Sequence, residues 1–427
     1  MTIAPVFLAR LRAALDREQA TGLLVQAVRA ASVTGQEAAM VDCLAPEMER
    51  LGLSPVVAEA LPGRPNIWGT KPGSGGGKHL LFMGHTDVVQ ARDWSAHWRG
   101  AAQEDPFGAP VIDGELWGRG AADLKAGICA ALMAASLLDR AGIRLQGDLS
   151  FAFVCDEESG EPGTGISAGV RDYAARVVRN EIARPDAAIY VEPTRLNVMP
   201  VQIGFFIAQV VITGQSAYFG RPELGRDALK ATHAVLAAIW AHSDEIAASG
   251  EHPLLGRAFA LVTGIEGGGL IAVPGECRFS LIRKLLPGET LDAATAALEA
   301  VVHRALPKDV EAVVSWIAGR DHLRGGSPAG IALDHPLVTG LSACLAAVRP
   351  GAGVVEGAPF WSEMPFLTDI IGCPAVYAAP GDISICHTNF ERVSLAEYHD
   401  AIVAFAAFIA EFCGTVAEDG PEPGRDS

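Results

Sequence analysis

The chain has 427 residues, half of them hydrophobic and 19% charged, so it can bury an extensive core and is not globally disordered. This length exceeds what one hydrophobic core usually supports and predicts two domains. The formal net charge of −17 argues against nucleic acid and anionic membrane surfaces as partners. The eight cysteines are scattered without a paired Cys-x-x-Cys, so we expect reduced thiols and a cytoplasmic protein.

The first part of the chain is predicted to be helical. Apolar positions recur with helical periodicity from about Val6 to Ala31 and again from about Gly35 to Leu51. Charged residues interrupt the first segment, which favours an amphipathic helix over a signal peptide. Short strands are expected at Pro55–Ala58 and Pro65–Gly69, before a glycine-rich connection. No uninterrupted apolar run reaches the roughly 20 residues of a membrane span.

The next strand carries the first candidate site residues. The apolar run Leu80–Val89 contains His85 and Asp87, two positions apart, where side chains of an extended strand point to the same side. A metal-binding imidazole usually gives its second N–H to an acceptor that fixes the tautomer, and a carboxylate can do this. Without further partners, the same pattern is a strand end with two polar residues facing water.

A glycine-rich turn then leads into an apolar helix. Gly118–Gly127 precedes the helix expected over Ile128–Ala141, and Asp123 lies where the turn becomes helical. A single aspartate at such a place is most often a helix N-cap. It becomes a candidate metal ligand only if other segments supply partners.

Two further strands end in carboxylates. The strand Leu149–Val154 is followed by Glu157 and Glu158, which must point in different directions because they are adjacent. The strand Ala187–Val191 is followed by Glu192. An exposed acidic turn is the simpler interpretation of each cluster taken alone.

Together these strand ends predict one site. In open α/β sheets, ligands bind beyond the carboxyl ends of the strands. His85, Glu157, Glu158 and Glu192 follow three such ends, and Asp123 lies in a turn beside them. Neighbouring carboxylates repel one another unless a cation or solvent neutralises them, so we expect a metal site at this edge.

The region from about residue 203 changes character. Its predicted order, strand-helix-strand-strand-helix-strand, is that of a ferredoxin-like domain inserted into the first. The chain then returns to the first domain, with a late His387 and Glu391 before the final helix. The expected elements are Phe205–Thr213, Leu224–Ser249, Ala258–Glu266, Gly275–Arg283, Leu291–Ala305 and Val310–Trp316. The expected domains are residues 1–202 with 321–413 (catalytic), 203–320 (inserted lid and dimerisation domain) and 414–427 (disordered tail).

The ordered motifs resemble the metallohydrolase family of acetylornithine deacetylase, succinyl-diaminopimelate desuccinylase, aminoacylase and carboxypeptidase G. The resemblance covers roughly residues 6 to 412. It is carried by Gly84–Asp87, Asp105–Phe107, Gly118–Lys125, Asp156–Ser159, Glu192-Pro193 and His387 with Glu391. It implies an α/β catalytic domain with a mixed sheet flanked by helices, and the inserted βαββαβ domain.

The resemblance also implies roles for the site residues. His85 and Glu192 would bind one divalent cation, Glu158 and His387 a second, and Asp123 would bridge the two. Asp87 would orient His85, and Glu157 would be the general base. Such mixed ligands suit Zn²⁺, Co²⁺ or Mn²⁺, and two cations would acidify a water molecule. Cys155 and Cys386 flank ligand positions, but we expect them to be structural.

Three positions in the inserted domain and its return segment concern the substrate. Tyr218 stands where the family often has an oxyanion-stabilising histidine, and Glu363 where relatives tend to have an aspartate. Arg283 matches the family and could hold a substrate carboxylate with two hydrogen bonds. We treat Arg283, Tyr218 and Glu363 as candidate substrate-binding residues.

Three functions are compatible with this pattern. The first is a metal-dependent hydrolase that cleaves a C–N bond in a small carboxylate-bearing substrate, such as an N-acyl amino acid or dipeptide. The second is an aryl-amine aminohydrolase that deaminates substrates of the 5-nitroanthranilate type, since the oxyanion side of the site is altered. The third is an inactive, metal-free binding relative. By resemblance, we expect a homodimer through the inserted domain.

Overall fold

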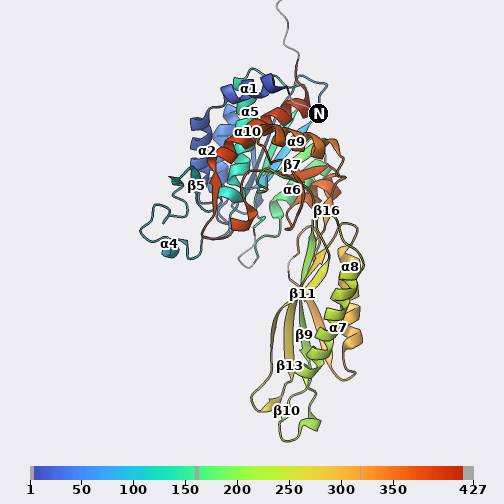
Figure 1. Ribbon diagram of the computed structural model, residues 1–427. Coiled ribbons are helices and arrows are strands. Elements are labelled where there is room, and N and C mark those ends of the chain that lie inside the picture. Colours follow the sequence, from blue (N-terminus) through green and yellow to red (C-terminus); the bar gives the residue numbers. More distant parts are fainter. Residues whose placement is uncertain (1–3, 159–162, 318, 417–427) are drawn as a thin grey trace, which may run out of the picture. The chain divides into compact units, whose positions relative to one another are not determined.

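The computed structural model describes residues 4–158, 163–317 and 319–416 (Figure 1). The expected disordered tail therefore falls largely on residues 417–427, which lie outside the described part. The chain divides into two compact units, each of which is described by itself. The first comprises Met1–Pro200, Ile331–Glu356 and Phe366–Ser427, and the second Val201–Gly330 and Gly357–Pro365.

The first unit is built on a mixed sheet, in the order β1-β2-β6-β3-β7-β18-β8. The four central strands, β6, β3, β7 and β18, are parallel, while β2 and β8 flank them in the antiparallel sense. The predicted mixed α/β fold is therefore confirmed. These strands are β1 (Val56–Leu61), β2 (Arg64–Lys71), β3 (Leu80–His85), β6 (Leu149–Val154), β7 (Ala187–Tyr190), β8 (Val198–Gln202) and β18 (Ala375–Tyr377). A further strand, β17 (Val355–Ala358), pairs with β8.

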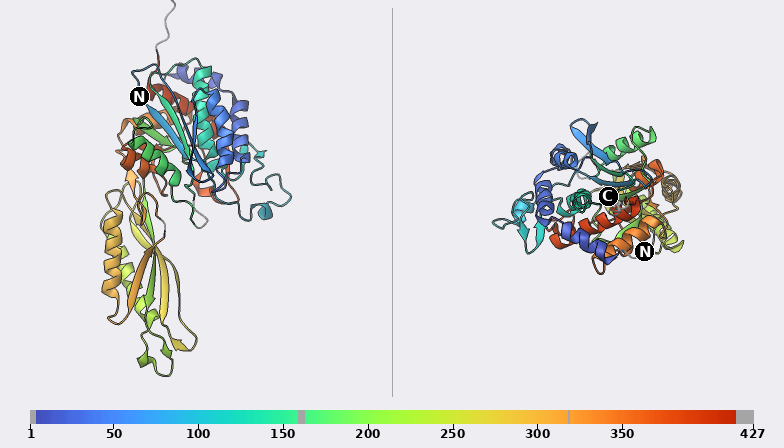
Figure 2. Two further views of the ribbon diagram at one scale, coloured as in Figure 1. Left: turned by 180° about the vertical axis from the view of Figure 1, so that it is seen from behind. Right: turned by 90° about the horizontal axis from the view of Figure 1, so that it is seen from above.

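Helices cover both faces of this sheet. Helices α5 and α10 contact β3 on one face, and α6 contacts β1, β2 and β6 on the other (Figure 2). The helices are α1 (Pro5–Ala14), α2 (Arg17–Arg29), α3 (Ala38–Arg50), α4 (Trp94–His97), α5 (Ala126–Arg140), α6 (Ala168–Val178), α9 (Pro336–Val348) and α10 (Leu395–Cys413). Single helical turns are η1 (Ala121–Lys125), η3 (Phe366–Ile371) and η4 (Ile383–Ile385).

Helix α5 is apolar on all sides because it lies in the core. Within the described residues, Ala121–Arg140 is the stretch long and apolar enough to cross a membrane, with a mean hydropathy of 1.6. Its most apolar 18 residues are all buried inside the protein, whereas Asp139 and Arg140 at its end are exposed. Burial on every side is what a central helix of a layered α/β unit requires.

The single helix expected near the start of the chain is two helices in the structure, α1 and α2. The periodicity between Val6 and Ala31 predicted one element, but the chain breaks at Asp16, which adopts an extended conformation between α1 and α2. The Asp16 carboxylate accepts the N–H of Gln19 at 3.0 Å and so caps α2. The prediction was wrong because α1 and α2 both bury apolar residues, so the helical spacing of apolar positions continues across Asp16.

A small antiparallel sheet joins two distant segments of the first unit. Its order is β19-β5-β4, with strands β4 (Val111–Ile112), β5 (Glu115–Trp117) and β19 (Arg392–Ser394). Trp117 pairs with Arg392 in this ladder. The pairing brings the chain that leads into η1 beside the chain that precedes α10.

The second unit is an antiparallel sheet, in the order β11-β13-β9-β14, with helices α7 and α8. Alternate residues of the strands are buried, and with both helices they form one apolar core. Its main elements are β9 (Gly204–Thr213), α7 (Ala228–Ala248), β11 (Phe259–Gly267), β13 (Glu276–Leu285), α8 (Leu291–Ala305) and β14 (Glu311–Trp316). Shorter ones are β10 (Ala217–Tyr218), η2 (Pro222–Leu224), β12 (Ala272–Val273), β15 (Gly325–Gly326) and β16 (Ala329–Gly330).

Candidate metal centre

Strand register sets the level of the first two candidate ligands. In the parallel core, His85 ends β3 opposite Val154, and Met83 pairs with Tyr190 of β7. Glu192 lies two residues beyond Tyr190, so it extends to the level of His85 at the same edge. The chain after Val154 turns at this edge too, as the sequence predicted for the strand ends.

Close packing at two glycines brings the turn η1 onto this edge. A Cβ atom on Gly84 would lie 2.8 Å from Leu124 Cδ1, and one on Gly127 would lie 2.4 Å from the carbonyl oxygen of Val191. A larger residue at either position would push the turn away from β3 and β7. The carboxylate of Asp123, in this turn, faces imidazole groups and makes no helix-capping hydrogen bond. The N-cap interpretation of Asp123 is therefore excluded.

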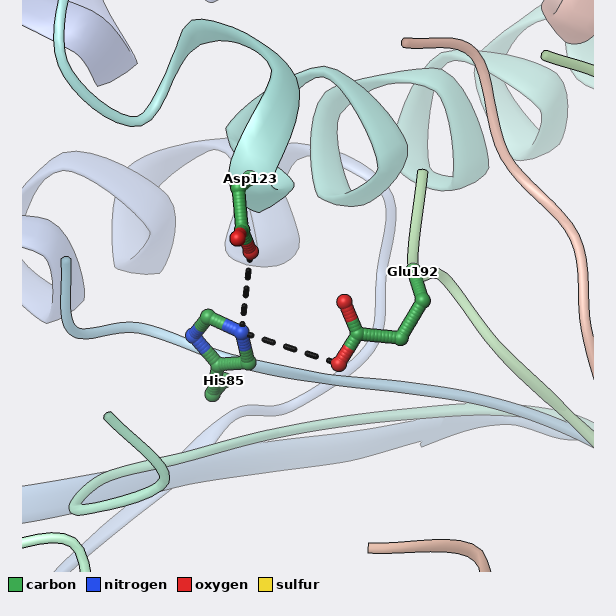
Figure 3. Close-up of side chains that lie close together, drawn as sticks. All are labelled: His85, Asp123 and Glu192. Carbon is green, nitrogen blue, oxygen red and sulfur yellow. Dashed lines mark ion pairs between the residues drawn. The ribbon is translucent and has the colours of Figure 1, made fainter. Parts of the chain in front are cut away.

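His85, Asp123 and Glu192 form a first group of possible ligands (Figure 3). His85 Nε2 lies 3.3 Å from Asp123 Oδ1 and 3.8 Å from Glu192 Oε1. One ligand atom from each residue lies within 4.8 Å of the others. All three residues are at most 6% exposed. This group can surround one small cation.

Asp123, Glu158 and His387 form a second group. His387 Nε2 lies 3.2 Å from Asp123 Oδ2 and 3.0 Å from Glu158 Oε1. Asp123 therefore turns one carboxylate oxygen to each group. A carboxylate in that position can bridge two cations.

The tautomer of His85 is set by a backbone group. Its Nδ1 lies 2.9 Å from the carbonyl oxygen of Asp87. Because a carbonyl only accepts hydrogen bonds, Nδ1 is the protonated nitrogen, and the lone pair of a neutral imidazole is on Nε2. We expected the Asp87 carboxylate in this role, but its Oδ1 is 3.8 Å from Nδ1. The acceptor that faces His85 Nδ1 is therefore the backbone oxygen of Asp87.

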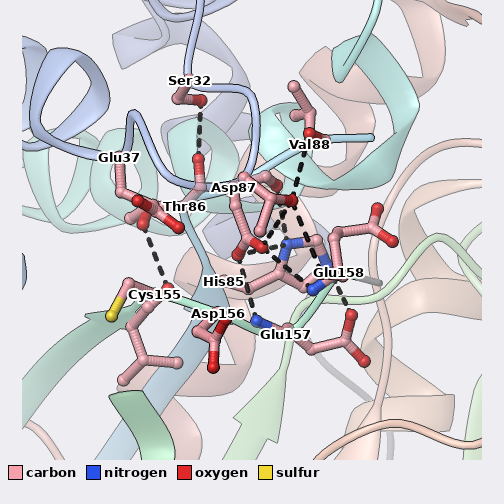
Figure 4. Close-up of polar contacts among 12 residues, drawn as sticks. Ser32, Glu37, His85, Thr86, Asp87, Val88, Cys155, Asp156, Glu157 and Glu158 are labelled. Atoms are coloured by element: carbon pink, nitrogen blue, oxygen red, sulfur yellow. Dashed lines mark hydrogen bonds and ion pairs between the residues drawn. The ribbon is translucent and has the colours of Figure 1, made fainter. Parts of the chain in front are cut away.

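The Asp87 carboxylate instead holds the acidic turn after β6. It accepts the N–H groups of Glu157 at 3.2 Å and of Glu158 at 2.9 Å (Figure 4). It also accepts the hydroxyl of Thr34 at 3.1 Å. The register explains this, because His85 opposite Val154 places Asp87 beside the turn. Asp87 therefore fixes His85 with one end and the acidic turn with the other.

The electrostatics of the centre favour positive charge. Hydrogen bonds to Asp123 and Glu158 raise the pKa of His387 to about 11. Burial acts against a charge on His85, but its contact with Asp123 and the surrounding carboxylates outweigh burial and raise its pKa. Burial and the charge of Asp123 raise the pKa of Glu158 to about 8. Without a cation, protons bound to these groups therefore offset the negative charge of the buried carboxylates.

The donor set fits divalent cations. Within the described residues, Asp123 Oδ1 is buried and accepts no hydrogen bond. When His85 loses its second proton, the lone pair on Nε2 faces this oxygen at 3.3 Å, so two acceptors are then opposed. Such a pair is stabilised by a cation between the atoms, and imidazole with carboxylate oxygen suits Zn²⁺, Mn²⁺ or Co²⁺.

Comparison with known proteins identifies the family. Residues 81–411 match peptidase family M20/M25/M40. The chain belongs to this family. It is 27% identical to N-formyl-4-amino-5-aminomethyl-2-methylpyrimidine deformylase of Bacillus subtilis, over 87% of this chain and 88% of the relative. It is 28% identical to acetylornithine deacetylase of Myxococcus xanthus, over 82% and 84%.

Solved structures agree with the fold of the M20 family. A tripeptidase from Staphylococcus aureus superposes with a TM-score of 0.71 at 16% identity, over 93% of this chain and 99% of the other. The match to the family model confirms the resemblance inferred from the motifs. As a member of the M20 family, the protein is a hydrolase that acts on C–N bonds.

In this M20 hydrolase, Glu157 lies beside the two ligand groups without belonging to either. Its Oε2 is 4.0 Å from His85 Nε2. Its side chain is 12% exposed, so solvent reaches it while its backbone is held by Asp87. A carboxylate so placed can exchange a proton with a molecule bound next to His85.

The candidate substrate residues belong to the second unit. Tyr218 lies on β10 and is 64% exposed, whereas Glu363 is completely buried. Arg283 is 5% exposed, and its guanidinium lies 2.5 Å from Glu289 Oε1. Holding a substrate carboxylate would therefore require Glu289 to release Arg283. Their roles stay predictions.

Sequence reasoning missed a buried ionic network behind the acidic turn. Arg64, at the start of β2, forms ion pairs with Glu37 and, at 2.7 Å, with Asp156 Oδ1. The Asp156 carboxylate also accepts three backbone N–H groups of the segment 165–168. These residues are far apart in the sequence and follow no spacing rule. The charge of Arg64 at the start of an apolar strand was the available signal.

The two cysteines that flank ligand positions donate hydrogen bonds to backbone oxygens. Cys155 Sγ lies 3.4 Å from the carbonyl oxygen of Arg64, and Cys386 Sγ lies 3.3 Å from that of Asp382. Burial raises the pKa of both thiols. Neither cysteine belongs to the two ligand groups found among the described residues, which supports the structural role expected for them.

Proposed function

We propose that this M20 hydrolase uses divalent cations to cleave the C–N bond of an N-acyl amino acid or dipeptide-like substrate. One observation carries the proposal: the buried Asp123 carboxylate is shared by two ligand groups, with Glu157 beside them. His85, Asp123 and Glu192 would hold one cation, and Asp123, Glu158 and His387 the other.

The chemistry follows from these positions. Bound cations would acidify a water molecule and polarise the amide carbonyl. Glu157 would take the proton of the attacking water and pass it to the departing nitrogen. Asp87 supports both steps, because its carbonyl keeps the lone pair of His85 on Nε2 and its carboxylate fixes the backbone of Glu157.

The substrate class is supported by the relatives. Their names describe removal of a formyl group and of the acetyl group of acetylornithine, so both act on an acylated amine. A small N-acylated amino acid is therefore our first choice, with Arg283 as the candidate partner of its carboxylate and Tyr218 and Glu363 as further candidates near the substrate.

A substrate screen tests this function. Protein loaded with Zn²⁺, Mn²⁺ or Co²⁺ would be incubated with N-formyl, N-acetyl and N-succinyl amino acids and with dipeptides, and amine and ammonia release would be measured separately. We expect release of the free amine. Ammonia release from an aromatic amine, without cleavage of any acyl substrate, would reject the proposal.

We also propose that the protein is a cytoplasmic homodimer formed through the second unit. Strand β11 lies at the edge of its sheet, and Leu261 and Ile265 on it are 53% and 55% exposed. An apolar edge strand can pair with a second copy. Light scattering should give about twice the chain mass of 44.6 kDa, and a monomer mass would contradict the proposal.

A further inference from the structure

The two segments that carry Asp123 and His387 are joined before they reach the metal centre. Strands β5 and β19 pair with each other, with Trp117 opposite Arg392. One residue beyond β5, the N–H of Gly118 donates to the carbonyl oxygen of Glu391 at 3.2 Å. One segment then continues to Asp123, and the other has just left His387.

A buried ion pair connects them at the next position. Arg119 and Glu391 are 2% and 0% exposed, and their side chains form an ion pair. The second carboxylate oxygen of Glu391 accepts the N–H groups of Ala122 at 3.2 Å and Asp123 at 3.1 Å. Arg119 also donates to the carbonyl oxygen of Thr388 at 3.3 Å.

These contacts fix backbone segments whose angles are not those of a regular helix or strand. Asp123 has the non-helical angles φ −114° and ψ 94°, and His387 has a φ of 62°, in the left-handed region. The N–H groups at the start of a helical turn have no partner within the turn, and Glu391 supplies one. Arg119 holds the carbonyl next to His387. The pair thus contacts the backbone at or next to both ligands.

Apart from the shared Asp123, the first ligand group depends on other elements. His85 ends β3, and Glu192 follows β7, so the ladder of the central sheet places both. Glu158 is held by Asp87. Among the ligands in the described structure, only Asp123 and His387 lie on the two segments that the pairing of β5 with β19 joins.

We propose that the Arg119–Glu391 pair is a positioning element that sets Asp123 relative to His387 and so controls binding of the second cation. The inference rests on the proposed metal-dependent function. Weakening the pair loosens two ligands of the group Asp123, Glu158 and His387, whereas the other group shares only Asp123 and keeps His85 and Glu192 in their strand-based positions. The affinity for the second cation should therefore fall more than the affinity for the first.

Glu391→Gln is the informative variant. A glutamine presents one oxygen and one amide N–H₂, so it can satisfy either Arg119 or the backbone N–H groups of the turn, but not both. Glu115→Gln is the matched control. Glu115 forms an ion pair at 2.7 Å with Arg392 on the same ladder, and no contact of Glu115 reaches a ligand in the described structure.

The experiment titrates Co²⁺ into chelator-stripped protein, followed by visible absorption and by competition with a chromogenic chelator. We expect two binding events in the natural protein and in Glu115→Gln. In Glu391→Gln the second constant should weaken by about 10- to 100-fold, the usual cost of removing a ligand's supporting contact. The first should weaken clearly less, because only Asp123 of its three ligands is affected. Thermal unfolding of the metal-free proteins is recorded in parallel.

The outcomes are separable. Two unchanged constants in Glu391→Gln, with or without a lower unfolding temperature, would overturn the positioning role alone. No binding to the natural protein would reject the proposed function and this inference together. If Glu391→Gln does not fold, Arg119→Lys serves instead, because lysine keeps the charge but cannot bridge Glu391 and Thr388. Arg119→Lys should show the same selective loss, and two unchanged constants in it would equally overturn the role.

Discussion

Asp87 holds His85 through its backbone carbonyl oxygen, 2.9 Å from Nδ1, and not through its carboxylate. The carboxylate is thereby free to hold the acidic turn at Glu157 and Glu158. One residue thus connects the tautomer of a candidate ligand with the position of the candidate base. Substitutions that keep the backbone and change the side chain can separate the two roles.

Asp87→Asn should preserve the His85 contact and disturb the acidic turn. An amide offers one oxygen, so it cannot accept both N–H groups and the Thr34 hydroxyl without turning its own N–H₂ toward a donor. We expect kcat to fall by about 10- to 100-fold, in line with the loss of supporting contacts around a metal site. Thr34→Val removes one of the three hydrogen bonds and should have a smaller effect. Natural kcat in Asp87→Asn would contradict this account.

Glu157→Gln tests the general base. The amide is nearly the same size but cannot take a proton, so kcat should fall by about 10²- to 10⁴-fold. Because Glu157 belongs to neither ligand group, metal content measured by atomic emission should match that of the natural protein. Near-normal activity would reject Glu157 as the base, and loss of metal would instead make it a ligand.

Metal affinity should rise with pH. The pKa of His387 is raised from 6.5 to about 11 in the metal-free fold, so its proton must leave before a cation binds. Between these two values, each increase in pH makes the imidazole more available. Calorimetry in buffers of different ionisation enthalpy should detect proton release on binding. Affinity that is independent of pH in this window would contradict the arrangement.

The raised pKa of His387 also predicts that the metal-free protein loses stability as the pH rises, whereas metal affinity increases. A pKa raised by folding gives stability that is fully present below the unfolded value of 6.5 and is lost as the pH rises through about 11. Urea unfolding of stripped protein should therefore show this contribution declining over that window. His387→Ala should remove it, and an unchanged pH dependence in that variant would assign the effect to another group.

The buried network of Arg64 predicts a large effect on stability. Arg64→Met leaves Glu37 and Asp156 buried without their cation, and breaking such a pair costs about 3–5 kcal/mol. The free energy of unfolding in urea measures it. Arg179→Met breaks the exposed pair with Glu181 and should leave this free energy nearly unchanged. Equal effects of the two substitutions would refute the structural role of Arg64.

The features that the sequence predicted best are those that depend on a local pattern of residues. The strand Leu149–Val154 was predicted with its observed bounds, because an apolar run between turn residues has few alternatives. The site edge was also predicted, since strands that end in polar residues at a sheet's carboxyl edge must bring them together. The break at Asp16 was missed, because two helices packed on one core preserve a common period.

Contacts that connect distant segments could not be predicted. Arg64 reaches Asp156 over 92 residues, and Arg119 reaches Glu391 over 272. Nothing in the spacing of such residues distinguishes them from surface charges. The orienting atom of Asp87 was missed for a related reason, because the sequence specifies side chains and only the register shows which backbone oxygen faces His85.

The central claim is that bound divalent cations and Glu157 together hydrolyse an amide C–N bond. Its most direct test follows amine release from N-acetyl amino acids before chelation, after chelation and after stepwise return of Zn²⁺, Mn²⁺ or Co²⁺. We predict that activity disappears on chelation, returns with the cation, and does not return in Glu157→Gln. Full amide hydrolysis by the chelated protein, or full recovery in Glu157→Gln, would contradict the claim.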